Sequence, residues 1–171
     1  AESFSLTFGS CVHKAVEDTY DHFMKKGKFP DFKFFKESFT RELEGEGVES
    51  SIKSLCMIGI EGVKKWFDRE SKAPIKPIGL EEKLHATIDD DLVFSGKYDK
   101  TELISEKEKS VRVVDYKTGK PDDHVRGIIK GLEDGVGLAS DECEGYLRQL
   151  VAYKLLFERD KRRKEGYKVT K

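Results

Sequence analysis

The sequence predicts a fold in which helices come first, an antiparallel group of strands follows, and one further helix comes near the end. Apolar residues recur with helical spacing through residues 1–72. From residue 78 to 120 the apolar residues fall instead in short runs rich in β-branched and aromatic side chains, which is typical of strands. Helical spacing returns over residues 141–160. This order favours an α/β or an α+β core.

Three helices are expected in the N-terminal part, over residues 8–26, 31–44 and 48–69. Ser10 is a candidate N-cap of the first helix, and Gly27 is expected to end it. The third helix is predicted from the helical spacing of Ile52, Leu55, Ile58, Val63 and Trp66. The prolines of "KAPIKPIG" then indicate a linker into the strand region.

Three strands are expected over residues 80–88, 92–104 and 110–118, separated by the turn sequences "DDD" and "SEKEK". Strands joined so closely form an antiparallel meander. We predict a loop over residues 121–140 and a helix over 141–160. That helix is indicated by Tyr146, Leu150, Tyr153 and Phe157. The final residues, "EGYKVTK", resemble the start of another strand.

Composition limits the classes of function. The 171 residues have the length of a single domain, and eleven Phe with six Tyr are untypical of disorder. The formal net charge of −1 gives no global sign of nucleic-acid binding, which would therefore need a local basic patch. No apolar run reaches the length of a membrane span, and no secretory signal is evident.

The cysteines and the chain ends give two further expectations. Cys11, Cys56 and Cys143 are far apart and include no C-x-x-C pair, which indicates reduced thiols in a cytoplasmic protein. The chain begins at an alanine and stops inside an apparent strand, so we expect a domain excised from a larger protein.

Charged residues at the end of the third predicted strand are the first candidates for chemistry. The stretch "VVDYKTGK" leads from β-branched residues into Asp115, Tyr116 and Lys117. Residues two apart in a strand share a face, so Asp115 and Lys117 would be neighbours, and strand pairing could bring Asp99 close. Two carboxylates suit Mg²⁺ or Mn²⁺, and a lysine beside the metal can hold a bound water or offset phosphorane charge. Surface salt bridges to nearby lysines are the alternative interpretation.

Four residues elsewhere add to this pattern, although each has an ordinary structural explanation. His13 lies on the first predicted helix, and Gly96 lies on the second predicted strand. Gln149 and Tyr153 are four residues apart and share one face of the last helix. Taken singly, the four fit a helix histidine, a β-bulge glycine, a solvated glutamine and a core tyrosine.

Together these residues resemble the RecB-like branch of the PD-(D/E)xK nuclease superfamily. That branch has a "G-x-x-x-H" helix, a "G-x-x-D" strand, a strand ending in "D-Y-K-T-G", and a "Q-x-x-x-Y" helix. The chain carries these motifs in the same order, at Gly9–His13, Gly96–Asp99, Asp115–Gly119 and Gln149–Tyr153. The resemblance implies an α/β fold like that of restriction endonucleases, with a mixed central β-sheet, an antiparallel meander core and flanking helices.

The resemblance also implies a role for each matching residue. His13, Asp99 and Asp115 would bind a metal, with the backbone carbonyl of Tyr116 as a further ligand. Lys117 would be the catalytic lysine, acting with the two aspartates. The implied reaction is metal-dependent hydrolysis of a DNA phosphodiester by in-line attack of water, which leaves a 5′-phosphate and a 3′-hydroxyl.

Other residues receive looser roles from the resemblance. Gln149 and Tyr153 would orient the site or contact DNA, and Glu81 matches a less regular acidic position on the first strand. Arg126 and Lys130, in the predicted loop, would either contact phosphate or be solvated.

The family further implies a cofactor and partners. The cofactor would be Mg²⁺ or Mn²⁺, the substrate DNA, and the partner a superfamily-one helicase in the same chain or complex, with an exonuclease role in DNA repair or recombination. Some relatives hold an iron–sulfur cluster through four cysteines, and three cysteines at these spacings predict none. The alternatives are a catalytically silent DNA-binding or helicase-docking domain, and an unrelated α+β domain.

Overall fold

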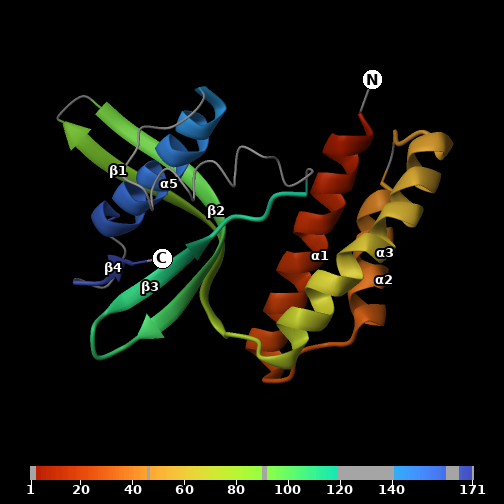
Figure 1. The fold of residues 1–171 in the computed structure, drawn as a ribbon, viewed down its shortest axis with the longest axis horizontal. Coiled ribbons are helices and arrows are strands. Elements are labelled where there is room, and N and C mark those ends of the chain that lie inside the picture. Colours follow the sequence, from red (N-terminus) through yellow and green to blue (C-terminus); the bar gives the residue numbers. More distant parts are fainter. Residues whose placement is uncertain (1–2, 46, 90–91, 119–140, 161–165, 171) are drawn as a thin grey trace. The chain divides into compact units, whose positions relative to one another are not determined.

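A computed structural model of the chain describes residues 3–45, 47–89, 92–118, 141–160 and 166–170. Within these residues three helices come first (Figure 1): α1 (Phe4–Lys26), α2 (Phe32–Leu43) and α3 (Ser50–Lys72). The elements that follow are β1 (Pro77–Asp89), β2 (Leu92–Ser105), β3 (Ser110–Val114), α5 (Asp141–Arg159) and β4 (Lys168–Val169). The predicted order of helices, meander and helix is confirmed.

The strands form one sheet in the order β1-β2-β3-β4. The links from β1 to β2 and from β2 to β3 are too short for a crossover connection, so these neighbours are antiparallel. β3 and β4 pair in parallel, with Ser110 opposite Lys168 and Val111 opposite Val169. The predicted mixed sheet with an antiparallel meander core is therefore confirmed, as is the strand expected in the final residues.

The chain divides into two compact units. The first consists of Ala1–Glu81, Asp99–Leu103 and Val114–Thr118, and so contains the three N-terminal helices. The second consists of Glu82–Tyr98, Ile104–Val113 and Gly119–Lys171, and so contains α5 and β4.

Helix α1 begins at Phe4, earlier than its apolar spacing indicates. The predicted cap was wrong: Ser3 is the N-cap, and its Oγ accepts a hydrogen bond from the Leu6 N–H at 3.4 Å, whereas Ser10 lies inside the helix. Gly27 ends the helix as predicted. Its φ of 70° is left-handed, a conformation that glycine adopts at little cost.

The core of the first unit lies among α1, α2 and α3 and is largely aromatic. Phe35 is fully buried, and its ring centroid lies 5.5 Å from that of Phe67 and 6.1 Å from that of Trp66. Cys11 and Cys56 lie buried inside this core. The buried members are Cys11, Val12, Ala15, Val16, Tyr20, Phe35, Phe39, Leu43, Cys56, Ile60 and Phe67.

Helix α3 buries only part of the apolar spacing that predicted it, because Ile52, Val63 and Trp66 pack against the core while two other members of the pattern do not. Cys56, Ile60 and Phe67 are buried, whereas Leu55 and Ile58 are 52% and 73% exposed. The helix carries apolar side chains on more than one side, so spacing alone identifies the helix and leaves its buried face open.

In the second unit, α5 packs on β2. Tyr98 lies on β2, and its ring centroid is 6.0 Å from that of Tyr153 and 6.4 Å from that of Phe157. A Cβ at Gly96 would lie 2.6 Å from Leu156 Cδ1, so this glycine is needed for the close approach of helix and strand.

Part of α5 stays on the surface. Leu150, which the spacing groups with Tyr153 and Phe157, is 52% exposed.

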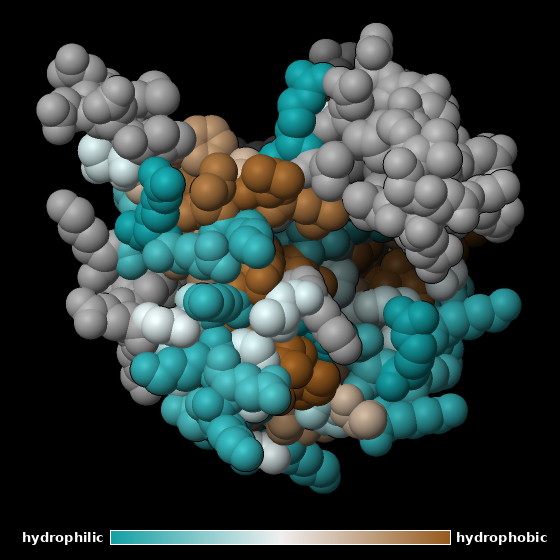
Figure 2. Space-filling model, turned by 60° about the vertical axis from the view of Figure 1, so that its left-hand side comes forward, coloured by the Kyte–Doolittle hydropathy of each residue, from teal (hydrophilic) through white to brown (hydrophobic). Residues whose placement is uncertain are grey.

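On the face drawn in Figure 2, apolar side chains gather in patches between polar ones. Among the described residues, no helix has both the length and the apolar character that crossing a membrane requires.

A buried ionic network joins β2 to α1 and α3 in the first unit. Lys100 and Glu102 are each 1% exposed, and Lys100 Nζ lies 2.6 Å from Glu102 Oε1. The same ammonium lies 3.7 Å from Glu70 Oε2 and 3.8 Å from the centroid of the Tyr20 ring. The Tyr20 hydroxyl donates to Glu70 at 2.6 Å, and burial raises the pKa of Tyr20 far above its ordinary value. Charges so deeply buried are tolerated only when paired.

The first prediction concerns this network. Lys100→Met should destabilise the protein by about 3–5 kcal/mol, because the Glu102 carboxylate stays buried without its ammonium partner. The double variant Lys100→Met/Glu102→Leu removes both charges and should recover most of that loss. Urea unfolding followed by circular dichroism measures both effects.

The control for this experiment is Lys64→Met. Lys64 forms a half-exposed surface pair with Asp68 on α3, and its loss should change stability by no more than about 1 kcal/mol. An equal loss of stability in the single and double Lys100 variants would contradict the buried pair.

Candidate metal centre

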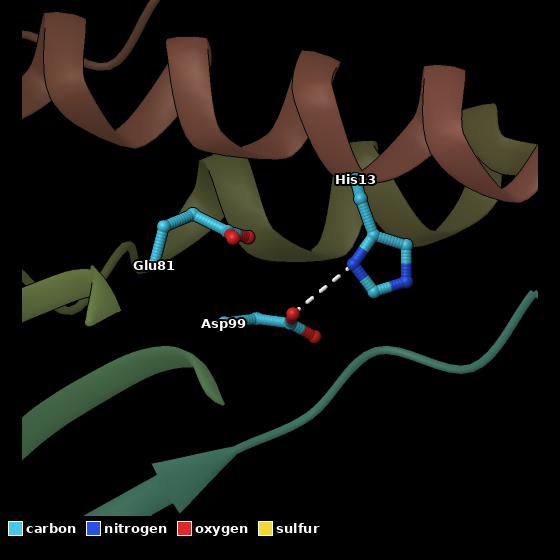
Figure 3. Close-up of side chains that lie close together, drawn as sticks. All are labelled: His13, Glu81 and Asp99. Atoms are coloured by element: carbon cyan, nitrogen blue, oxygen red, sulfur yellow. Dashed lines mark hydrogen bonds and ion pairs between the residues drawn. The ribbon is translucent and has the colours of Figure 1, made fainter. Parts of the chain in front are cut away.

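Three of the predicted site residues converge in the first unit: His13 from α1, Glu81 from β1 and Asp99 from β2 (Figure 3). Each offers one ligand atom, and these atoms all lie within 4.8 Å of one another. All three residues are partly buried. An imidazole and two carboxylates at this spacing can share one divalent cation, so the donor set fits a metal.

Asp99 holds the cluster together. Its Oδ1 lies 3.1 Å from His13 Nδ1, and its Oδ2 accepts a hydrogen bond from the Tyr116 N–H at 2.5 Å. The Asp99 side chain is only 12% exposed. The carboxylate therefore links β2 both to α1 and to the segment after β3, and these contacts fix its direction.

Helix α1 carries His13 beside the core, between the buried residues Val12 and Ala15. One turn earlier, a Cβ at Gly9 would lie 3.3 Å from Thr118 Oγ1. A larger residue at this position would press on the Thr118 side chain, which would have to move by a few tenths of an ångström. The "G-x-x-x-H" spacing thus allows the segment with Asp115 and Lys117 to approach the helix that carries His13.

Glu81 reaches the cluster through an unusual backbone conformation. Its φ is 48°, in the left-handed region that a residue with a side chain rarely occupies. Figure 3 shows its carboxylate directed toward Asp99 and His13. Strained backbone of this kind is concentrated at functional sites. In the sequence, Glu81 matched only a less regular acidic position of the family. Its positive φ could not be predicted, because the surrounding residues are those of an ordinary strand.

Asp115 and Lys117 lie next to one another, although not within a strand. β3 ends at Val114, so the strand predicted over residues 110–118 was too long. Lys117 Nζ still lies 2.6 Å from Asp115 Oδ2, with the lysine side chain 52% exposed and the aspartate 14%. Asp115 is not a member of the three-residue cluster, yet its negative charge acts on His13. The ion pair that sequence reasoning offered as the alternative is thus present beside the cluster.

Tyr116 anchors this segment in the core of the first unit. Its ring packs edge-on against Trp66, with centroids 5.4 Å apart and an interplanar angle of 81°. Burial raises the pKa of its hydroxyl well above the ordinary value. The ring therefore points into the core while the N–H bonds to Asp99. The role of its carbonyl as a metal ligand stays a prediction.

Gln149 and Tyr153 lie in the second unit. The Gln149 amide donates to the Tyr153 hydroxyl at 2.6 Å, and Tyr153 is 8% exposed against Tyr98. Their predicted contact with the site or with DNA remains a prediction. Arg126, Lys130 and the predicted loop over 121–140 lie outside the described residues.

The electrostatics of the cluster favour positive charge. The hydrogen bond to Asp99 raises the pKa of His13 above its ordinary value, burial opposes this, and the charges of Asp99, Glu81 and Asp115 raise it further. Carboxylates around one imidazole repel each other, and a cation among them removes that repulsion.

A mixed sheet that carries an imidazole–carboxylate cluster and an adjacent lysine–aspartate pair defines a candidate metal-dependent hydrolase. The sequence profile of the PD-(D/E)XK nuclease superfamily matches residues 1–170, and the chain belongs to that superfamily. No curated protein and no solved structure matches the chain. The match is to the superfamily as a whole, so the RecB-like branch stays a prediction.

The second prediction concerns metal binding. His13→Ala, Glu81→Gln and Asp99→Asn should each weaken Mn²⁺ binding by at least about tenfold, because the first removes a ligand atom, the other two remove a ligand's negative charge, and even outer-shell changes cost that much. Isothermal titration calorimetry at neutral pH measures the affinity. Glu82→Gln, which changes the carboxylate next to Glu81 in sequence, should leave it unchanged. An unaltered affinity in Asp99→Asn would rule out this cluster as the binding site.

The third prediction concerns pH. The protonated imidazole of His13 cannot bind a metal, and its pKa is raised, so Mn²⁺ affinity should start to fall at a higher pH than an ordinary histidine would give. Calorimetry over a pH series measures this fall. In His13→Asn the fall should begin only where carboxylates become protonated. The same profile in His13→Asn and the wild type would contradict a role for His13.

Proposed function

We propose that the protein is a divalent-metal-dependent nuclease that hydrolyses DNA phosphodiester bonds. The observation that carries this proposal is the convergence of His13, Glu81 and Asp99 in a chain that belongs to a nuclease superfamily. Asp99 bonds to the N–H of Tyr116, whose neighbours in sequence are Asp115 and Lys117. The metal ligands and the catalytic lysine would therefore meet at one place.

His13, Glu81, Asp99 and Asp115 would hold the metal, with the Tyr116 carbonyl as a further ligand. A bound Mg²⁺ or Mn²⁺ supplies a Lewis acid for a phosphoryl oxygen and lowers the pKa of a water. Because the donor set includes an imidazole, it favours Mn²⁺ over Mg²⁺.

Lys117 would act beside these ligands. Its ammonium lies 2.6 Å from Asp115, a contact that directs the head group. From this position the ammonium would hold the attacking water by its oxygen, or stabilise the negative charge that grows on the phosphoryl group. Its half-exposed side chain leaves room for a substrate phosphate.

The finer assignment is a helicase-associated exonuclease module that acts in DNA repair or recombination. The near-neutral net charge supports this, because a partner helicase would hold the DNA and the nuclease would need only to cut it. In this role Gln149 and Tyr153, which bond to each other, would orient the site or contact DNA.

The fourth prediction tests cleavage. With Mn²⁺ or Mg²⁺ the purified protein should cut end-labelled DNA, and Lys117→Ala and Asp115→Asn should lower the rate about 10²–10⁴-fold, the loss expected for a charge-stabilising or proton-handling group. Gel electrophoresis of the products gives the rate and the end chemistry. Lys107→Ala, an exposed lysine in the turn between β2 and β3, is the control and should cut at the wild-type rate.

Two outcomes would go against the proposal. Equal cleavage by the wild type, Lys117→Ala and Asp115→Asn would identify a contaminating nuclease. Metal binding without any cleavage would favour the catalytically silent DNA-binding or docking domain.

A further inference from the structure

A cavity of about 370 Å³ lies in the first unit, next to the candidate site. Its walls come from α1, α3 and the segment after β3, and they are mostly apolar or aromatic. At one side it is bordered by Lys117, the proposed catalytic residue. The residues that line it are Phe8, Val12, Val16, Gly59, Gly62, Val63, Trp66, Tyr116, Lys117 and Thr118.

Two glycines of α3 help to form this cavity. A Cβ at Gly59 would lie 2.9 Å from the ring of Phe8, and a Cβ at Gly62 would meet no atom within 4 Å. Glycine inside a helix is destabilising relative to alanine. Gly59 is explained by its contact with Phe8. Gly62 is exposed, and nothing in the packing of the described residues requires a glycine there, so this position leaves open space beside the cavity.

The aromatic walls indicate what the cavity would hold. Three aromatic residues line it: Phe8, Trp66 and Tyr116. Trp66 and Tyr116 meet edge to face, with centroids 5.4 Å apart, and one face of Phe8 is already covered by Phe4. Such rings bind the faces of flat, apolar groups, and every nucleobase offers such a face. The volume lies within the range of about 300–1,000 Å³ that small-molecule sites occupy. A nucleobase therefore fits both the size and the chemistry of the cavity.

We propose that this cavity holds a nucleobase of the DNA strand being cut, next to the scissile phosphate. The inference rests on the proposed nuclease function, because Lys117 borders both the cavity and the place where that phosphate would lie. A base can enter only after it leaves the stack, so the substrate class is a DNA strand that is unpaired at the site. A stacked base contributes about 1–3 kcal/mol of binding.

Binding tests the inference without cleavage. Trp66 is the only tryptophan of the chain, so its fluorescence reports on the cavity wall directly. In EDTA, a short thymine oligonucleotide should quench this emission. The same oligonucleotide made of abasic residues, and a blunt duplex, should not. The quenching titration also gives the affinity of each variant.

Variants of Gly62 should show whether the base lies in the cavity. Gly62→Leu fills the open space and should abolish quenching and weaken binding about 5–150-fold, which corresponds to the loss of one stacked base. Gly62→Ala adds one methyl group and should give an intermediate loss. Ser54→Leu places the same side chain on an exposed position of α3 and is the control, with quenching unchanged. Circular dichroism checks that each variant is folded.

The fifth prediction concerns cleavage of strands that carry one abasic residue. It shows which nucleotide, counted from the scissile phosphate, places its base in the cavity. When the abasic residue is next to the scissile phosphate, the wild type should cut that bond about 5–150-fold more slowly. Gly62→Leu should cut intact and abasic strands at the same reduced rate. If Gly62→Leu is unfolded, the test uses Gly62→Ala instead. The ratio of its cleavage rates on intact and abasic strands should be smaller than the ratio for the wild type.

The possible failures are distinguishable. Cleavage that is indifferent to abasic residues at every position would overturn the base cavity and leave the nuclease function intact. Quenching that Gly62→Leu does not change, or that an abasic strand produces equally, would also overturn it. Absence of cleavage with a metal bound would overturn the proposed function, and with it this inference.

Discussion

The two hydrogen-bonding contacts of the Asp99 carboxylate are the interaction on which the candidate site depends. One oxygen meets His13 on α1, and the other accepts the N–H of Tyr116. A single side chain thus connects β2 to a helix and to the segment that carries Asp115 and Lys117. The left-handed backbone of Glu81 adds a second carboxylate to the same point. Two carboxylates then lie beside a single imidazole, and a divalent cation bound between them would offset their negative charge.

Buried charges next along the same strand support this arrangement. Lys100 follows Asp99 directly, and its ammonium is enclosed by Glu102, Glu70 and the ring of Tyr20. Buried pairs add little net stability, but they are costly to break one partner at a time. We interpret the network as a device that fixes the position of β2 against α1 and α3, and therefore the position of Asp99 as well.

Two glycines among the described residues allow a close approach between elements that are far apart in the sequence. Gly9 lets Thr118 approach α1, and Gly96 lets Leu156 of α5 approach β2. Both belong to the motifs by which the sequence resembles a nuclease family, and neither contact could be read from the sequence. The reason lies in distances between elements far apart in the chain: an added Cβ would collide with Leu156 at Gly96 and would press on Thr118 at Gly9.

The order of helices and strands could be predicted from the sequence, because hydrophobic periodicity is a local property. The sequence motifs also singled out His13, Asp99, Asp115 and Lys117 as candidates. Packing decided the rest. Whether α3 buries Ile60 or Ile58 depends on which side meets the other helices, because both sides are apolar. That Glu81 completes the cluster depends on one backbone angle and on contacts between residues distant in sequence. The strand before Asp115 ends where β3 loses its pairing, a limit set by the neighbouring strands and not by the residues themselves.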